Sequence, residues 1–243
     1  GTYKVGDVVN VQVVFSEAVV VTTAGGTPKL TVETGTTDRA VSYASGSESN
    51  TLVFAYTVQA GDVSSDLDYA STSALALSGG AIKDLAGNTA TITLNDPSAG
   101  STTNSIADTK AIVIDGVIPT ISSAAANGGS KTITLTMSEA VTGSPIGGAF
   151  AVVASGAANN VTAVSVSGTK VTLTTANVIV NDATVTVGYT QNSSSGKQMQ
   201  DAAGNPVANT SSNVTATITN DTAAPTVSSV TSSTSDRTHK IGD

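Results

Sequence analysis

The stretch KTITLTMSEAV (131–141) decides the fold of this chain. From Thr132 to Met137 polar and apolar residues alternate, which is the pattern of a strand with one face on a core and the other in water. Further runs rich in Val, Ile and Thr alternate in the same way, at residues 7–15, 51–58, 164–175, 183–189 and 214–219. The sequence therefore predicts an all-β protein built from half-buried antiparallel strands.

The features around this stretch occur twice, in the same order along the chain. The matched pairs are FSEAV (15–19) with MSEAV (137–141), KDLAGN (83–88) with QDAAGN (200–205), and IDGVIPTISS (114–123) with NDTAAPTVSS (220–229). Internal similarity of this kind is the sign of tandem copies of one structural unit. We expect two tandem immunoglobulin-like β-sandwiches, at residues 1–116 and 117–221, because each half holds the short alternating strands of such a fold.

The end of the chain resembles the start of a third copy. PTVSS at 225–229 repeats PTISS at 119–123, and the closing RTHKIGD resembles the opening GTYKVGD. In the second copy the Pro-Thr segment should open a first edge strand, and the first copy has no such segment. We therefore expect residues 1–116 to lack their first strand, and residues 222–243 to be an orphan first strand of a following repeat.

Composition excludes several classes of protein. The 243 residues include no Cys, and Asp and Glu outnumber Lys and Arg by 18 to 10. Disulfides and Cys-based metal sites are therefore excluded, and the net charge of -8 has the wrong sign for binding nucleic acid. No apolar run approaches the roughly 18 residues of a membrane span. No basic segment of a signal peptide follows Gly1.

The usual catalytic arrangements are also missing. The single His, His239, lies in the terminal segment, where its counterpart in the first copy is Tyr3, so a Ser-His-Asp triad is not expected. No phosphate-binding Gly-rich loop followed by Lys is present. The sequence therefore predicts a protein that is not an enzyme.

Acidic side chains should converge where the two sandwiches meet. In the immunoglobulin-like strand order, Glu139 follows the second strand of copy two, Asp201 and Asn205 lie in its last loop, and Asp115 ends copy one. Ca²⁺ prefers six to eight oxygen ligands from carboxylates, amides and carbonyls. We therefore predict a calcium site at this junction. The alternative is a plain D-x-A-G-N turn, held by its own Asp and Asn side chains.

Weaker metal ligands lie elsewhere. The first copy carries Glu17, Asp84 and Asn88 without a linker Asp before them, which predicts half a site. Asp221 is a linker Asp without its following domain. Asp62 lies in a turn of copy one, where it is either a turn residue or a ligand that reaches the junction.

These motifs together resemble a known family. S-E-A-V after a strand, D-x-A-G-N late in the repeat and a D-x3-P-T junction resemble bacterial Ig-like tandem repeats of giant secreted surface proteins. Such repeats occur in RTX-type adhesins and in a cyanobacterial swimming-motility surface protein. The resemblance covers nearly the whole chain, twice. It implies a β-sandwich stalk module, extracellular and at the cell surface, often stiffened by calcium at the linkers.

Three functions compete at this point. The first is a structural extender, whose partners are the neighbouring repeats of the same protein. The second is a self-assembling filament or surface layer in which residues 222–243 complete residues 1–116 of the next chain, because an open sheet edge accepts a donated strand. The third is a glycan- or protein-binding module, although the low aromatic content of 3% argues against a sugar platform.

Overall fold

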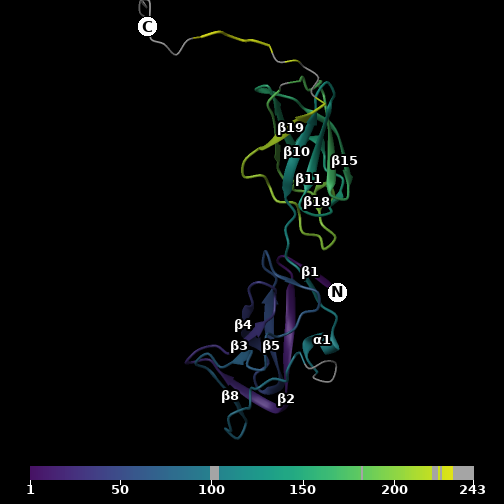
Figure 1. Cartoon of the computed structure of the whole chain (residues 1–243). Coiled ribbons are helices and arrows are strands. Elements are labelled where there is room, and N and C mark those ends of the chain that lie inside the picture. The colour runs from purple at the N-terminus through teal and green to yellow at the C-terminus, as the bar shows by residue number, and fades with distance from the viewer. Residues whose placement is uncertain (99–103, 182, 221–223, 225, 232–243) are drawn as a thin grey trace, which may run out of the picture.

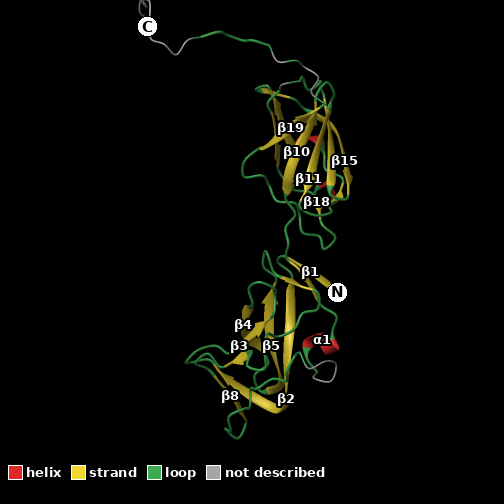
Figure 2. Ribbon diagram, in the orientation of Figure 1, coloured by secondary structure: helices red, strands yellow, loops and turns green. Residues whose placement is uncertain are grey.

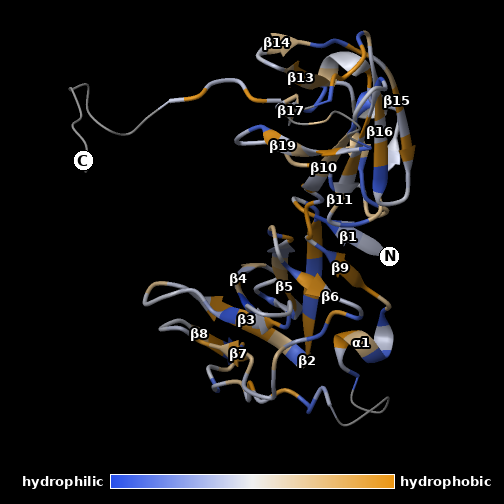
Figure 3. Ribbon diagram, turned by 45° about the horizontal axis from the view of Figure 1, so that its top comes forward, coloured by the Kyte–Doolittle hydropathy of each residue, from blue (hydrophilic) through white to orange (hydrophobic). Residues whose placement is uncertain are grey.

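The computed structural model describes residues 1–98, 104–181, 183–220, 224 and 226–231. Strands make up nearly all of the regular structure in these ranges, so the all-β prediction is confirmed (Figures 1 and 2). Every alternating run contains at least one strand: β2 (Val8–Thr22), β5 (Ser49–Thr57), β11 (Thr132–Met137), β15 (Val161–Ser167), β16 (Lys170–Thr175), β17 (Val185–Tyr189) and β19 (Val214–Thr219). Figure 3 shows hydrophobic and hydrophilic residues alternating along the strands.

The strands form two bodies, each around a hydrophobic core of its own. The first core takes its buried residues from Val9 to Ile114, and the second takes them from Ala124 to Ala216. Figure 1 shows the two bodies end to end, joined by the strand-free linker 116–120. No described helix is long and apolar enough to cross a membrane.

The second body is a sandwich whose layers share one strand. Its strand order is β14-β13-β17-β19-β10-β11-β16-β15, where β10 is Ile121–Asn127, β13 is Phe150–Ala154 and β14 is Ala157–Ala158. β10 pairs antiparallel with β11 on one side and parallel with β19 on the other. Along β11 every second residue is buried, as the alternation predicts. β10 therefore connects the two layers around the core.

The first body also consists mainly of strands, in a different sheet arrangement. Its sheets have the orders β7-β3-β4-β5-β2-β8 and β1-β9-β6. Besides β2 and β5, the strands of this body are β1 (Thr2–Lys4), β3 (Lys29–Val32), β4 (Arg39–Ser45), β6 (Val63–Ser64), β7 (Leu75–Ala76), β8 (Ala81–Asp84) and β9 (Val113–Asp115). β1 lies parallel to β9, as β10 lies parallel to β19. A short helix, α1 (Ile106–Thr109), precedes β9 and is capped by Ser105.

The repeated motifs occupy equivalent positions in the two bodies. After SEAV in the second body, β12 (Thr142–Gly143) pairs with β18 (Met199–Gln200), with Thr142 opposite Gln200. In the first body the end of β2 pairs with β8, with Val20 opposite Lys83. Each pair therefore brings the residues that follow SEAV beside the residues that lead into D-x-A-G-N.

The predicted strand at 222–243 falls mostly outside the described residues, as does Asp221. Residues 226–231 are described, and none of them belongs to a strand. Two apolar side chains in this segment are almost fully solvated, Val227 at 84% and Val230 at 91% exposure.

Candidate functional site at the junction of the two bodies

The loop DAAGN (201–205) is a turn closed by its own side chains. The Oδ1 atom of Asp201 accepts hydrogen bonds from the N–H groups of Gly204 at 2.7 Å and Asn205 at 2.8 Å. Its Oδ2 atom accepts from Nδ2 of Asn205 at 2.8 Å. Gly204 has a φ of 95°, a conformation that residues with a Cβ rarely adopt. The motif thus sets its own shape.

Asn205 also joins the two bodies. Its side chain is fully buried, and its Nδ2 atom donates a second hydrogen bond to the carbonyl oxygen of Asp115 at 2.8 Å. Its Oδ1 atom accepts from the N–H of Val5 at 2.9 Å. Asp115 and Val5 both belong to the first body, one at the end of β9 and one after β1. A single amide therefore connects three segments, with both of its donor hydrogens in use.

Glu139 completes the cluster with a carboxylate that is poorly solvated. Its Oε1 atom is buried and has no hydrogen-bond partner among the described residues. Burial raises the pKa of Glu139, and the negative charges of Asp201 and Asp115 raise it further. The structure thus brings Asp115, Glu139, Asp201 and Asn205 to one place, as their positions in the strand order predict.

The cluster is not arranged as a ready-made metal site. Within the described ranges, no three His, Asp or Glu side chains lie close enough together to hold an ion. Both oxygens of Asp201 already accept N–H groups, and Oδ1 of Asp115 accepts from the N–H of Val117 at 3.2 Å. Among the described residues of this cluster, Oε1 of Glu139 is the buried carboxylate oxygen that has no hydrogen bond. Calcium binding here stays a prediction.

The equivalent loop in the first body has the same shape, and within the described ranges its Asn side chain bonds to no other body. Asn88 donates from its N–H to Oδ1 of Asp84 at 2.8 Å and from Nδ2 to Oδ2 at 2.7 Å. Asn88 is exposed, and so is Glu17. This loop follows β8, at the end of the first body that faces away from the junction (Figure 1). The predicted half site is therefore a solvated turn in this structure.

Asp62 supports the linker from the side of the first body. Its buried carboxylate accepts from Nε and Nη2 of Arg39 at 2.8 and 2.6 Å, and from the Tyr56 hydroxyl at 2.7 Å. Burial alone would raise the pKa of Asp62, but the hydrogen bonds from Arg39, Tyr56 and the N–H of Gln59 outweigh burial and lower it. These donors fill the carboxylate, which favours the turn interpretation over a ligand role.

The backbone beside Asp62 holds the linker directly. The N–H of Gly116 donates to the carbonyl of Asp62 at 2.7 Å, and the N–H of Gly61 donates to the carbonyl of Gly116 at 2.8 Å. A Cβ at Gly116 would lie only 2.3 Å from the carbonyl oxygen of Gln59. The linker therefore needs glycine here because two backbones approach closely. The sequence motifs gave no sign of this contact, of Val5 or of Arg39, since none of them repeats in the second copy.

Part of the second body is similar to a known repeat. The family described as "Putative flagellar system-associated repeat" matches residues 143–194. This agrees with the motility-related part of the family resemblance and does not extend to RTX-type adhesins. No curated protein matches the sequence.

Two solved structures of bacterial S-layer proteins are similar to part of the chain. The first is the crystal structure of the S-layer protein rSbsC(31-844), with 22% identity, a TM-score of 0.35 and coverage of 42% of this chain and 14% of that one. The second is the N-terminal part of the bacterial S-layer protein SbsC, with 22% identity, a TM-score of 0.34 and coverage of 41% and 24%. The chain therefore spans only a small part of either protein.

Proposed function

We propose that this chain is a structural extender, a rigid segment in the stalk of a large bacterial surface protein that serves adhesion or motility. The buried side chain of Asn205 carries this proposal, because it fixes the second body on the end of the first. The tandem repeat and the match to a flagellar system-associated repeat support the same function. The module would work outside the cell, with neighbouring repeats as its partners and without catalysis.

The proposed rigidity follows from the hydrogen bonds that restrain both ends of the linker. The linker is short, its first residue Gly116 is bonded to the turn at Gly61 and Asp62, and its end is bonded within the second body. Thr120 there exchanges hydrogen bonds with Ser138. Since both ends of the linker are held and Asn205 bonds to the first body, bending the junction requires breaking the hydrogen bonds of this buried side chain.

Small-angle scattering of the full chain and of Asn205→Ala tests this function. We expect one narrow distribution of distances between the bodies in the full chain, and a broadened one in the variant with both bodies still folded. Asn88→Ala, which alters the solvated copy of the loop, should scatter like the full chain. An equally broad distribution in all three proteins would contradict a rigid stalk.

We further propose that Ca²⁺ strengthens this junction. Glu139 would be the leading ligand through its unpartnered oxygen, with Asp115 and Asp201 turning toward the ion. The support is chemical: the negative charges of Asp201 and Asp115 add to burial in raising the pKa of Glu139, and a divalent cation among the three carboxylates would offset that repulsion. Thermal melts in calcium and in EDTA test the proposal, since saturation at about 100 times Kd adds about 2.7 kcal/mol. Identical melts would leave the junction held by hydrogen bonds alone.

A further inference from the structure

The chain enters and leaves the second body through two neighbouring strands. β10 begins at Ile121, directly after the linker, and β19 ends at Thr219, at the other end of the body (Figure 1). The two strands are direct neighbours in the sheet and run parallel. Tension along the chain would therefore pull the start of β10 and the end of β19 in opposite directions, and the load would pass across the ladder that joins these strands.

The parallel pairing decides how this ladder meets the load. Its register runs from Ala124 opposite Ala216 to Asn127 opposite Thr219, and the hydrogen bonds of a parallel ladder are evenly spaced. Parallel strands that are pulled from opposite ends slide past each other, so all the bonds between them are stretched together. Strands that are pulled from the same end separate one bond after another. The first geometry resists the larger force, because the bonds share the load.

Further hydrogen bonds hold both points at which the load would enter. At the end of β19, the N–H of Gly128 donates to the carbonyl of Thr219 at 2.8 Å, and the Thr219 hydroxyl donates to the carbonyl of Ala126 at 3.3 Å. At the start of β10, Thr120 exchanges two hydrogen bonds with Ser138, each of 2.9 Å. β10 also pairs with β11 on its other side. This strand is therefore held along both edges, and it cannot leave the body until both ladders break.

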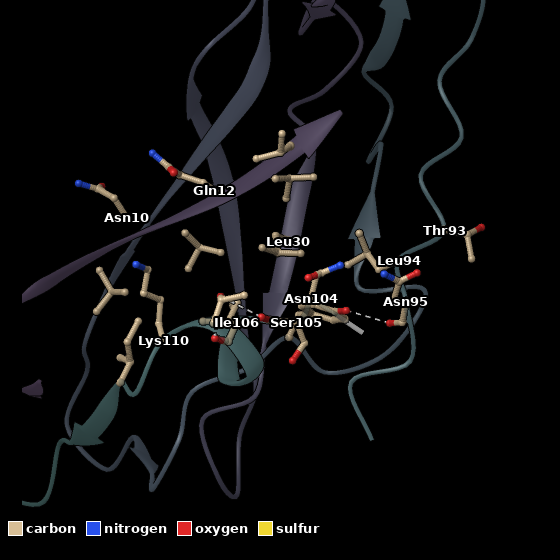
Figure 4. A pocket seen from close by; sticks show the side chains of 17 residues that line it. Asn10, Gln12, Leu30, Thr93, Leu94, Asn95, Asn104, Ser105, Ile106 and Lys110 are labelled. Atoms are coloured by element: carbon tan, nitrogen blue, oxygen red, sulfur yellow. Dashed lines mark hydrogen bonds between the residues drawn. The ribbon is translucent and has the colours of Figure 1, made fainter. Parts of the chain in front are cut away.

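The first body is built differently beside the strand that corresponds to β11. Figure 4 shows a groove of about 600 Å³ there, between Asn10 and Gln12 on β2 and Ile106 and Lys110 on the segment around α1. Among the described strands, β1 pairs only with β9. The second body is therefore the one in which a strand is paired with both the last strand and β11.

We propose that the second body bears tension, and that the ladder between β10 and β19 is the clamp that resists it. This inference deepens the stalk function and rests on it for the direction of the load, because a stalk that serves adhesion is pulled along its length. The clamp lies wholly within residues 120–219, so it involves no residue of another repeat.

Single-molecule pulling in two directions tests the clamp. Since the chain contains no Cys, a pair of introduced Cys residues provides the only thiols for attaching handles. Val117→Cys/Thr226→Cys places the handles beyond opposite ends of the two strands, whereas Val117→Cys/Ser212→Cys places both where β10 and β19 begin. We expect the unfolding force to be roughly twofold or more higher for the first pair, because several hydrogen bonds must break together.

A matched pair of proline variants locates the resistance. The N–H of Ala124 has the same alternation as that of Gly128 and faces β19, so Ala124→Pro removes one bond of the clamp. Ser165→Pro interrupts the ladder between β15 and β16 opposite Thr172, outside the path of the load. Both variants should unfold at lower urea concentration than the full chain. Only Ala124→Pro should lower the force between handles at 117 and 226, because forced unfolding depends on the unfolding rate under load.

Two results would overturn the inference. One is an unfolding force between handles at 117 and 226 that is no higher than the force between handles at 117 and 212, a comparison that holds even if Ala124→Pro does not fold. The other is an equal loss of force in Ser165→Pro and Ala124→Pro, since the resistance would then lie outside the clamp. Neither result bears on the scattering test, which measures bending of the junction without load, so failure of this inference is distinguishable from failure of the stalk function.

Discussion

The two D-x-A-G-N loops have the same structure and different surroundings. In both, the Asn donates to both oxygens of the Asp, at 2.8 and 2.7 Å in the first loop and at 2.8 Å twice in the second. The φ angles of Gly87 and Gly204 are 96° and 95°. Yet Asn88 is exposed, whereas Asn205 is fully buried and bonded to the other body.

This difference separates the loop conformation, which the motif itself determines, from the connecting role, which depends on neighbouring residues. The loop takes its shape from its own Asp, Gly and Asn, because it is the same with and without a partner. The connecting role arises only where a carbonyl at the end of β9 and a backbone N–H after β1, both from the first body, meet the Asn side chain. The same D-x-A-G-N motif therefore serves as a solvated turn in the first body and as a joint between the bodies in the second.

Replacing the two asparagines tests this comparison with the largest expected effect. Asn205→Ala leaves the N–H of Val5, the carbonyl of Asp115 and Oδ2 of Asp201 without partners, and we expect a loss of about 3 kcal/mol in the free energy of unfolding. Asn88→Ala removes only solvated bonds and should cost about 0.5 kcal/mol. Urea unfolding followed by amide exchange in each body measures both. Equal losses would show that the loops matter only as turns.

Much of this arrangement could be predicted from the sequence, for reasons that lie in particular residues. The alternation in KTITLTM predicts β11 because side chains along a strand face opposite sides. The order of Asp115, Glu139 and Asp201 predicts their convergence because neighbouring strands of a sandwich bring distant loops to one pole.

The parts that could not be predicted depend on a second body or on an unrepeated residue. The role of Val5 requires knowing how the first body presents its end. The bonds from Arg39 to Asp62 link a strand to a turn that share no motif. Whether an ion joins the cluster depends on carboxylate positions, which strand order does not set.

Asp62 offers the next largest effect, because its turn holds Gly116, the residue that follows the Asp115 carbonyl bonded to Asn205. Asp62→Asn replaces a buried carboxylate that accepts from Arg39 and Tyr56, and it should cost about 2 kcal/mol at neutral pH. The lowered pKa of Asp62 means that its stabilisation is present above its ordinary pKa of 3.8 and is lost as pH falls through the lowered folded value.

The pH dependence of unfolding gives the control for Asp62. The difference in unfolding free energy between the full chain and Asp62→Asn should shrink as the solution is made more acidic than the ordinary Asp pKa of 3.8. A difference that stays constant through that range would mean that the charge of Asp62 contributes nothing. The scattering profile should broaden only if the turn at Gly61 and Asp62 loosens its hold on Gly116.

The smallest effect compares the two glutamates of the SEAV motifs. Glu139 is partly buried beside Asp115 and Asp201, and its raised pKa means that its ionised form destabilises the folded state as pH rises above the ordinary Glu value. In EDTA at neutral pH, Glu139→Gln should therefore raise the unfolding free energy by at most about 1 kcal/mol, the scale of partly solvated charges. Glu17→Gln, at the exposed counterpart, should change nothing measurable. With calcium present, Glu139→Gln should instead lower the unfolding free energy, because the variant loses a ligand, and Glu17→Gln should still change nothing. If Glu139→Gln raised the unfolding free energy equally in calcium and in EDTA, the carboxylates of the junction would repel one another without binding an ion.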